Sequence, residues 1–247
     1  MSEISPYDAQ FSSVIGQDYD MLQLICPAAT EMSRLVGTAA ASYAQHTDAF
    51  PLHIIELGGG TGITTLSLLM ATEASQILSI DNEPTMQNQA KQRLQAWQTE
   101  GRLRFSADDA LTALQQLADN SADLVATAYT LHNFLHSYRK QVIKEIFRVL
   151  KPGGQFINGD RYGLDDLSQH TRTVQAEISH YFKVLLPLGR NDLLEQWIVH
   201  LFNDESEPHV MRETVAVQQL LDTGFVQVGV AHRQAVNALV TALKPKH

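Results

Sequence analysis

The chain has 247 residues, of which 44% are hydrophobic, and its formal net charge is −9. This length allows one α/β domain with a sizeable core, and the acidic balance argues against a nucleic-acid-binding surface. No apolar run approaches the roughly 20 residues of a membrane span, and the first residues do not resemble a secretory signal. A single cysteine excludes an intramolecular disulfide, so we expect a soluble cytoplasmic protein.

Residues 1–50 are expected to be helical and to form a cap on the main domain. Apolar spacing predicts a helix over 19–37, interrupted at Pro27, and a second helix near 38–46. From residue 51 the chain alternates between strand and helix patterns, which predicts a parallel sheet covered by helices. The expected strands are 52–57, 76–80, 103–106, 123–128 and 155–158, and the helices between them are 63–71, 84–99, 109–118 and 137–150, the last of which ends at the turn Lys151-Pro152-Gly153-Gly154.

A long helical insertion is expected after the fifth strand. It occupies 164–210 and is divided near Pro187 and Gly189. An insertion at this place can roof a pocket at the carboxyl edge of the sheet, where open α/β sheets bind ligands. A helix near 212–223 and strands over 225–232 and 237–243 follow. We therefore divide the chain into a cap (1–50), a ligand-binding core (51–163), a lid (164–210) and a C-terminal part of the core (211–247).

The first predicted strand runs directly into the glycine-rich turn Gly58-Gly59-Gly60-Thr61-Gly62. Glycine allows a positive φ and close approach of a ligand to the backbone, and the following helix offers unpaired N–H groups. The dinucleotide fingerprint G-x-G-x-x-G requires a third glycine where this chain has Ile63, which disfavours a nicotinamide or flavin site. The alternative is a glycine-rich turn without a ligand.

Acidic residues follow the next two strands. Asp81, at the end of the second strand, can accept hydrogen bonds from both hydroxyls of a ribose. Asn82 and Met86 come next, although Met86 could equally belong to the core of the following helix. After the third strand, either Asp108 or Asp109 can accept from an adenine amino group, and one of them can instead cap the next helix.

These segments resemble the class I S-adenosylmethionine (SAM) methyltransferases. Glu56-x-Gly58-x-Gly60-x-Gly62 is similar to their first motif, Asp109-Ala110 is similar to the D-A pair of their third, and 148–154 is similar to their R-V-L-K-P-G-G segment. The resemblance implies SAM as cofactor and a Rossmann-like α/β fold: a seven-stranded, mostly parallel sheet with an antiparallel last strand, a helical N-terminal cap and a helical insertion after strand 5. The cofactor contacts that it implies are Glu56, Gly58, Gly59, Gly60, Gly62, Asp81, Asn82, Met86, Asp108, Asp109, Ala110 and Tyr129.

The segment Leu131-His132-Asn133-Phe134 resembles the L-H-D-W segment of an O-methyltransferase family, in which the histidine is a general base. An imidazole has a pKa near neutrality and can take a proton from an acceptor hydroxyl or ammonium group. The alternative is that His132 only shapes its loop. No metal site is expected, because no carboxylate or cysteine cluster accompanies His132 and His136 in the sequence. The candidates for substrate binding are Tyr19, His136, Arg161 and Tyr162.

The resemblance implies a methyltransferase that acts on a small-molecule acceptor, with O- or N-methylation favoured. We expect a small-molecule substrate, no nucleic-acid or membrane partner, and a possible homodimer. The layout also resembles the carboxy-SAM synthases, but Gln219 stands where their carboxylate-binding arginine would align. The other alternative is a SAM-binding protein without catalysis.

Overall fold

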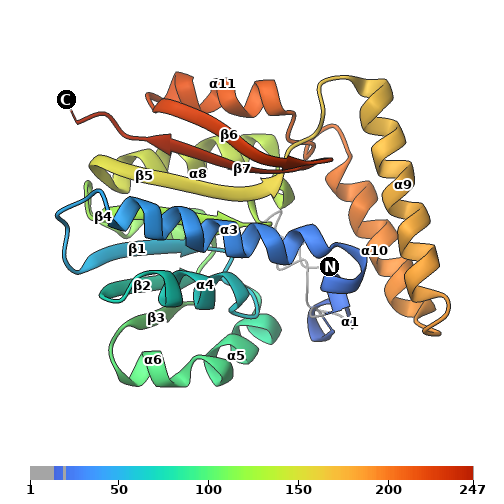
Figure 1. The fold of residues 1–247 in the computed structure, drawn as a ribbon, viewed down its shortest axis with the longest axis horizontal. Helices are drawn as coiled ribbons and strands as arrows, with labels where there is room; N and C mark the ends of the chain where they lie inside the picture. The colour runs from blue at the N-terminus through green and yellow to red at the C-terminus, as the bar shows by residue number, and fades with distance from the viewer. Residues whose placement is uncertain (1–13, 19–20, 247) are drawn as a thin grey trace, which may run out of the picture.

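The computed structural model describes residues 14–18 and 21–246. Within these ranges seven strands form one sheet, in the order β3-β2-β1-β4-β5-β7-β6 (Figure 1). The first five strands are parallel to one another, and β7 runs antiparallel to both of its neighbours, β5 and β6. The predicted Rossmann-like sheet is confirmed. Its strands are β1 (Leu52–Leu57), β2 (Ser75–Ile80), β3 (Leu103–Ser106), β4 (Ala122–Ala128), β5 (Leu150–Arg161), β6 (Val226–Gln234) and β7 (Asn237–Leu243).

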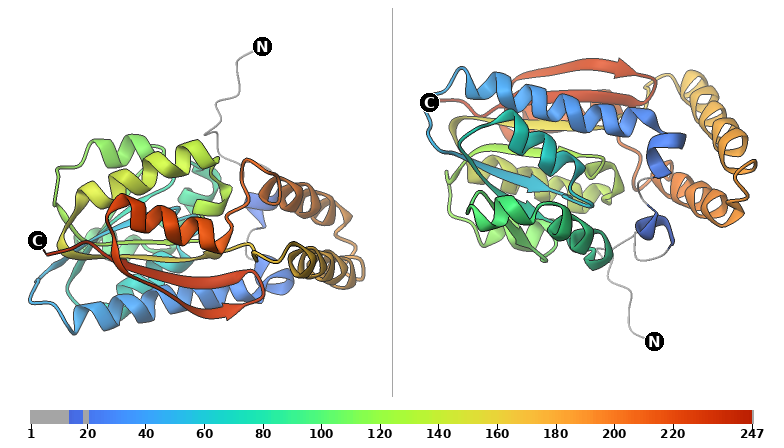
Figure 2. Two further views of the ribbon diagram at one scale, coloured as in Figure 1. Left: turned by 90° about the horizontal axis from the view of Figure 1, so that it is seen from above. Right: turned by 60° about the horizontal axis from the view of Figure 1, so that its bottom comes forward.

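Helices cover both faces of the sheet (Figures 1 and 2). On one face lie α3 (Pro27–Ala44), α4 (Ile63–Ala71), α5 (Pro84–Arg93) and α6 (Gln95–Thr99), and on the other lie α7 (Ala110–Gln115), α8 (His136–Val149) and α11 (Glu213–Thr223). The remaining helices lie near the carboxyl ends of the parallel strands. They are α1 (Val14–Gln17), α2 (Leu22–Ile25), the 3₁₀ turn η2 (Leu131–Asn133), α9 (Leu167–Leu185) and α10 (Asn191–Asp204).

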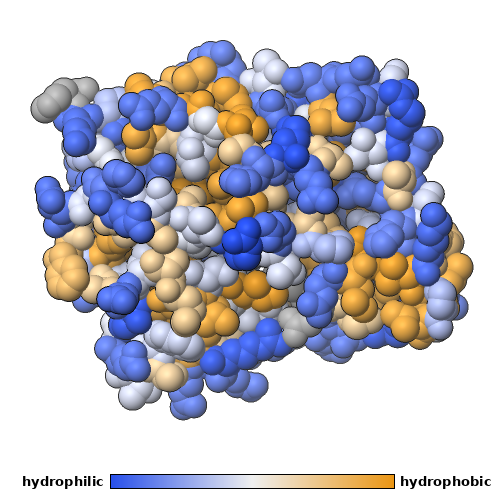
Figure 3. All heavy atoms as spheres, viewed as in Figure 1, coloured by the Kyte–Doolittle hydropathy of each residue, from blue (hydrophilic) through white to orange (hydrophobic). Residues whose placement is uncertain are grey.

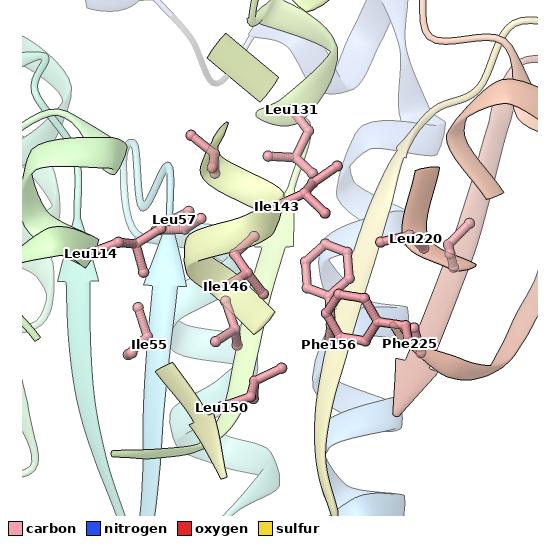
Figure 4. Packing of buried hydrophobic residues seen from close by; sticks show 14 of the residues in the cluster. Ile55, Leu57, Leu114, Leu131, Ile143, Ile146, Leu150, Phe156, Leu220 and Phe225 are labelled. Atoms are coloured by element: carbon pink, nitrogen blue, oxygen red, sulfur yellow. The ribbon is translucent and has the colours of Figure 1, made fainter. Parts of the chain in front are cut away.

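Side chains of β1 alternate between two hydrophobic cores, as the period of two in a strand requires. Ile55 and Leu57 pack toward α8 and α11, where Phe156 and Phe225 lie with their ring centroids 6.1 Å apart (Figure 4). Ile54 packs on the opposite face, toward α3 and α4. Because both faces are covered, the parallel strands are nearly continuously hydrophobic.

Several predicted boundaries differ from the structure, and three of the differences change how the chain is divided into elements. Residues 38–44 continue α3 instead of forming a second helix, because Pro27 occupies its first position and nothing after it breaks the helix. The helix predicted over 84–99 is divided at Leu94 into α5 and α6. The segment 151–154 does not form the predicted turn but lies inside β5. Gly153 has φ +80° there, and its N–H donates to the carbonyl oxygen of Lys244.

The insertion forms the predicted helical pair, α9 and α10, which stands beyond the carboxyl ends of the parallel strands (Figure 1). Tyr181, Leu193 and Trp197 of this pair pack against Leu22 and Ile25 of α2. Figure 3 shows hydrophobic surface over the lower part of the pair. Phe182, near the end of α9, and Leu186 and Leu188, in the turn between the two helices, are exposed. In the described ranges, no helix combines the length and the hydrophobicity that a membrane crossing demands.

Candidate functional site

A cavity of about 420 Å³ lies at the carboxyl ends of β1, β2 and β4. This is the edge at which open α/β sheets bind ligands, and its volume is typical of a small-molecule site. Residues of α2 and α3, such as Leu22 and Ser33, complete its wall. The structure brings to this cavity ten residues predicted from the sequence to contact the cofactor: Gly58, Gly59, Gly60, Asp81, Asn82, Met86, Asp108, Asp109, Ala110 and Tyr129.

The glycine-rich turn forms one wall of the cavity, and its conformation excludes side chains. Gly58 has φ +70°, and a Cβ at this position would lie 2.0 Å from Oγ1 of Thr130. Gly60 has φ +52° and donates its N–H to Oδ2 of Asp81 at 2.7 Å. The turn and the end of β2 therefore fix each other before any ligand binds.

Asp81 is the central carboxylate of this wall. Its Oδ1 accepts a second backbone hydrogen bond, from the N–H of Glu83 at 2.8 Å. Burial raises the pKa of Asp81 above its usual value, while the two N–H donors oppose that shift. Each oxygen keeps a lone pair, so the carboxylate can also accept hydrogen bonds from a ligand in the cavity.

The structure separates the roles of the two aspartates that precede α7. Asp109 caps the helix: its Oδ1 accepts from the N–H groups of Leu111 and Thr112, and Tyr138 donates to the same oxygen at 2.7 Å. Burial opposes ionisation of Asp109, but these hydrogen bonds outweigh it and lower the pKa. The carboxylate of Asp108 accepts a hydrogen bond from the hydroxyl of Ser106 at 2.9 Å and lines the cavity beside Asp109.

Glu56 and Gly62 were expected to contact the cofactor, and the structure places both outside the cavity wall. Glu56 is fully buried beneath the turn, where its Oε2 accepts from the hydroxyl of Thr65 at 2.7 Å. Burial raises the pKa of Glu56 to about 7. Gly62 precedes α4 with φ +89° and faces Leu94 and Ala90. Both residues shape the turn from behind, which a one-dimensional motif cannot distinguish from direct contact.

A second cavity, of about 30 Å³, adjoins the first and shares Leu22, Tyr129 and Asn133 with it. Tyr129 has φ +51°, a strained conformation for a residue other than glycine, and such strain is found preferentially at functional sites. Its hydroxyl donates to Oδ1 of Asn237. The remaining residues that line the second cavity are Cys26, His132, Arg161, Tyr181, Trp197, His200, Leu201 and Asp204.

His132 lies in η2, immediately after β4, and its Nδ1 is 2.5 Å from Oδ1 of Asp160. Asp160, at the end of β5, also accepts from the backbone N–H groups of Leu131 and Arg161. Burial opposes the charge of Asp160, but its interaction with His132 lowers the pKa below the usual value. A carboxylate at Nδ1 holds the proton there, so the lone pair of His132 lies on Nε2. That atom is 3.7 Å from Oδ2 of Asp204.

Two buried arginines hold the walls of the second cavity. Arg139 of α8 donates to the carbonyl oxygens of Leu131 and Phe134, which fixes η2. Arg161 forms ion pairs with Glu177 at 2.8 Å and with Glu205 at 2.9 Å, which tie β5 to α9 and to the end of α10. The charge of Arg161 is therefore compensated by the protein itself.

Two predicted substrate contacts lie away from both cavities. His136 is exposed, with Nε2 2.9 Å from the carbonyl oxygen of Val210. Tyr162 is buried and accepts from Nδ2 of Asn158 at 2.7 Å. Tyr19 lies outside the described residues. Conversely, the sequence interpretation missed His200 and Asp204 as candidate site residues. Their spacing of four residues, which places both on one face of α10, is the signal that could have identified them.

Comparison with known proteins finds similar sequences. Residues 55–158 match the methyltransferase domain family. A demethylmenaquinone methyltransferase of Leptospira interrogans is 37% identical over 109 residues, which are 44% of this chain and 43% of the relative. A carboxy-S-adenosyl-L-methionine synthase of Pseudoalteromonas translucida is 28% identical over 197 residues, which are 74% of this chain and 78% of that protein. The chain thus spans less than half the length of the first of these relatives.

Solved structures show the same fold. An O-methyltransferase family protein of Burkholderia thailandensis superimposes with a TM-score of 0.64 at 19% identity, covering 93% of this chain and 58% of the other. A methyltransferase structure from Methanococcus maripaludis has a TM-score of 0.61 at 17% identity, covering 100% of this chain and 98% of the other. The domain match over residues 55–158, the motif order and the sheet topology together support a class I SAM-dependent methyltransferase.

Proposed function

We propose that this protein transfers the methyl group of SAM to a small-molecule acceptor, with an oxygen or nitrogen atom as the favoured nucleophile. The observation that carries the proposal is the pair of adjoining cavities. The larger presents a glycine-rich turn and carboxylates suited to an adenosine ligand, and the smaller presents a buried histidine paired with an aspartate.

The residues of the larger cavity fit SAM. In this proposal Asp81 accepts from the ribose hydroxyls, and Asp108 accepts from the adenine amino group because Asp109 is engaged in capping α7. Gly58 and Gly60 leave the backbone open to the methionine part of the cofactor. When bound, SAM supplies an electrophilic methyl group on a positively charged sulfur.

In this proposal the reacting atom of the acceptor meets the methyl group at the smaller cavity, whose volume of about 30 Å³ admits that atom and not the whole acceptor. Tyr129 lines both cavities and therefore lies at the junction between donor and acceptor. In the reaction, the acceptor atom forms a bond to the methyl carbon while the carbon–sulfur bond breaks and its electron pair returns to sulfur. The protein must mainly align the two and exclude water. His132 activates the acceptor, and as a free imidazole it would take up the acceptor's proton on Nε2.

The size of the acceptor follows from what covers the smaller cavity. Tyr181 of α9 and Trp197 and Leu201 of α10 are all buried around it. This enclosure supports a small molecule in preference to a protein or a long RNA. A homodimer would fit the exposed hydrophobic surface on α9, and it stays a prediction.

A second candidate is carboxy-SAM synthesis, because the relative that covers 74% of this chain is named for that activity. The alternative requires a site for a second carboxylate substrate. Gln219, the residue aligned with the arginine expected for it, lies on α11 and lines neither of the two cavities. We therefore rank carboxy-SAM synthesis below methyl transfer.

The test is mass spectrometry of the products formed from SAM. Purified protein is incubated with SAM and a panel of small alcohols, phenols, amines and quinols, and separately with prephenate as carboxylate donor. We expect S-adenosylhomocysteine and a methylated acceptor from the panel, and neither product from the Asp81→Ala variant. Carboxylated SAM in the prephenate reaction would instead establish the second candidate. Absence of any product while S-adenosylhomocysteine still binds would identify a SAM-binding protein without catalysis.

A further inference from the structure

We propose that His132, His200 and Asp204 bind a divalent transition-metal ion, such as zinc, in the smaller cavity. The three side chains come from two segments far apart in the sequence, η2 and α10. The sequence interpretation expected no metal because it considered His132 only together with His136. The fold instead brings His132 to a histidine and a carboxylate of the insertion.

The ligand atoms have the spacing that such an ion requires. Oδ2 of Asp204 is 3.7 Å from Nε2 of His132 and 3.6 Å from Nε2 of His200. One ligand atom from each of the three residues lies within 4.8 Å of the other two. Tetrahedral ligands at about 2.1 Å from zinc are roughly 3.4 Å apart. The two distances from Asp204 are close to this spacing, and the most widely separated pair of ligand atoms would have to approach by at most about 1.4 Å.

The electrostatics of the cavity favour a cation. Asp204 is buried, and its Oδ1 has no hydrogen-bond partner among the described residues, an arrangement that is costly without a positive ligand. The nearby Arg161 interacts electrostatically with Asp204, but its guanidinium forms its ion pairs with Glu177 and Glu205.

Asp160 completes the arrangement from behind. Its hydrogen bond to Nδ1 of His132 directs Nε2 toward Asp204 and His200. A carboxylate that accepts from the distal nitrogen of a histidine ligand is the common support of zinc sites, since it fixes the tautomer and makes the imidazole a stronger ligand. The same pair that would orient a general base therefore also orients a metal ligand.

The metal site deepens the proposed function and rests on it only for the role of the fourth ligand. Three protein ligands leave one position open, and the cavity of about 30 Å³ can hold a water molecule or one ligand atom there. An acceptor oxygen or nitrogen at that position would lose its proton more readily, because coordination to a divalent ion lowers its pKa. His132 would then activate the acceptor as a metal ligand, with its lone pair on the ion, and the acceptor's proton would pass to solvent water instead of to Nε2.

The test uses the full chain and the metal alone. Protein stripped with a chelator is titrated with cobalt(II), whose d–d absorption reports tetrahedral coordination, and zinc content is measured after equilibrium dialysis. We expect about one ion per chain. His200→Gln and Asp204→Asn should each lose this binding, and Asp160→Asn should weaken it about 10- to 100-fold. His180→Gln is the matched control, because it removes an exposed imidazole of α9 that lies outside the cluster.

Binding of S-adenosylhomocysteine is measured on every sample, to show that each variant is folded. If wild-type protein binds S-adenosylhomocysteine but takes up no more cobalt than His200→Gln and Asp204→Asn, the metal site is refuted and the cofactor site stands. If cobalt binds with the expected dependence on these residues but S-adenosylhomocysteine does not bind, the metal site stands and the proposed function fails.

Discussion

Replacing Asp81 by alanine tests the cofactor site most directly. The carboxylate accepts from the N–H of Gly60 at 2.7 Å and from that of Glu83 at 2.8 Å, and in our proposal it also accepts from two ribose hydroxyls. A hydrogen bond to a charged group contributes about 1.5–3 kcal/mol, so the loss of two to the ligand should cost about 3 kcal/mol. This corresponds to a dissociation constant for S-adenosylhomocysteine that is roughly 100-fold higher.

The assay is calorimetric titration of wild type and variant with S-adenosylhomocysteine. Asp222→Ala is a suitable control, because it removes an exposed aspartate on α11 far from the cavity. Thermal unfolding of each apoprotein separates loss of the ligand contact from loss of the fold. A change in affinity of less than about threefold, or about 0.6 kcal/mol, in a folded Asp81→Ala variant would refute the assignment of the larger cavity to the cofactor.

Three further predictions concern the groups that support the two cavities. Gly58→Ala should abolish S-adenosylhomocysteine binding in calorimetry, because the added Cβ would lie 2.0 Å from Oγ1 of Thr130 on a backbone with φ +70°. Gly101→Ala is the control, because it also adds a Cβ at a positive φ but no atom lies within 4 Å of it. Arg139→Met should lower the free energy of unfolding by about 3 kcal/mol, because buried carbonyl oxygens of η2 lose their donor; urea denaturation checks this, and an unchanged midpoint would contradict it. Burial raises the pKa of Glu56 to about 7, so the folded state binds this proton more tightly than the unfolded state does. The resulting contribution to the free energy of unfolding is present at low pH and is lost as the pH rises toward 7. Glu56→Gln should therefore stabilise the protein by about 2 kcal/mol more at about pH 8 than at about pH 5, and equal effects at both would show that the carboxyl group is not protonated in the folded protein.

Much of the core could be predicted because its signals are local. The strand before Gly58 is hydrophobic on both faces, the glycine-rich turn demands a particular backbone, and Asp81 and Asp109 stand directly at the end of a strand and the start of a helix. Parallel strands place their carboxyl ends at one edge, so residues that follow them must meet there. This is why the residues predicted around the larger cavity are mostly found on its wall.

The sequence could not separate a residue that lines a cavity from one that supports the wall. Glu56 has the motif position of a ligand contact, but the pleat of β1 turns its side chain under the turn toward Thr65. Arg161 follows β5 at the expected edge, yet Glu177 and Glu205 of the insertion occupy its guanidinium. Side-chain direction and the identity of partners depend on neighbours that are distant in the chain.

By itself, then, the sequence determined the α/β fold, the edge of the sheet at which the larger cavity lies and the position of His132 after β4, because each follows from periodicity or from a short motif. Only the tertiary structure decided what His132 faces. Asp160 reaches it from β5, and His200 and Asp204 reach it from a helix more than 60 residues further along the chain. The packing of α10 over the sheet edge, which no local pattern encodes, converts a single histidine into a buried cluster able to hold a metal ion.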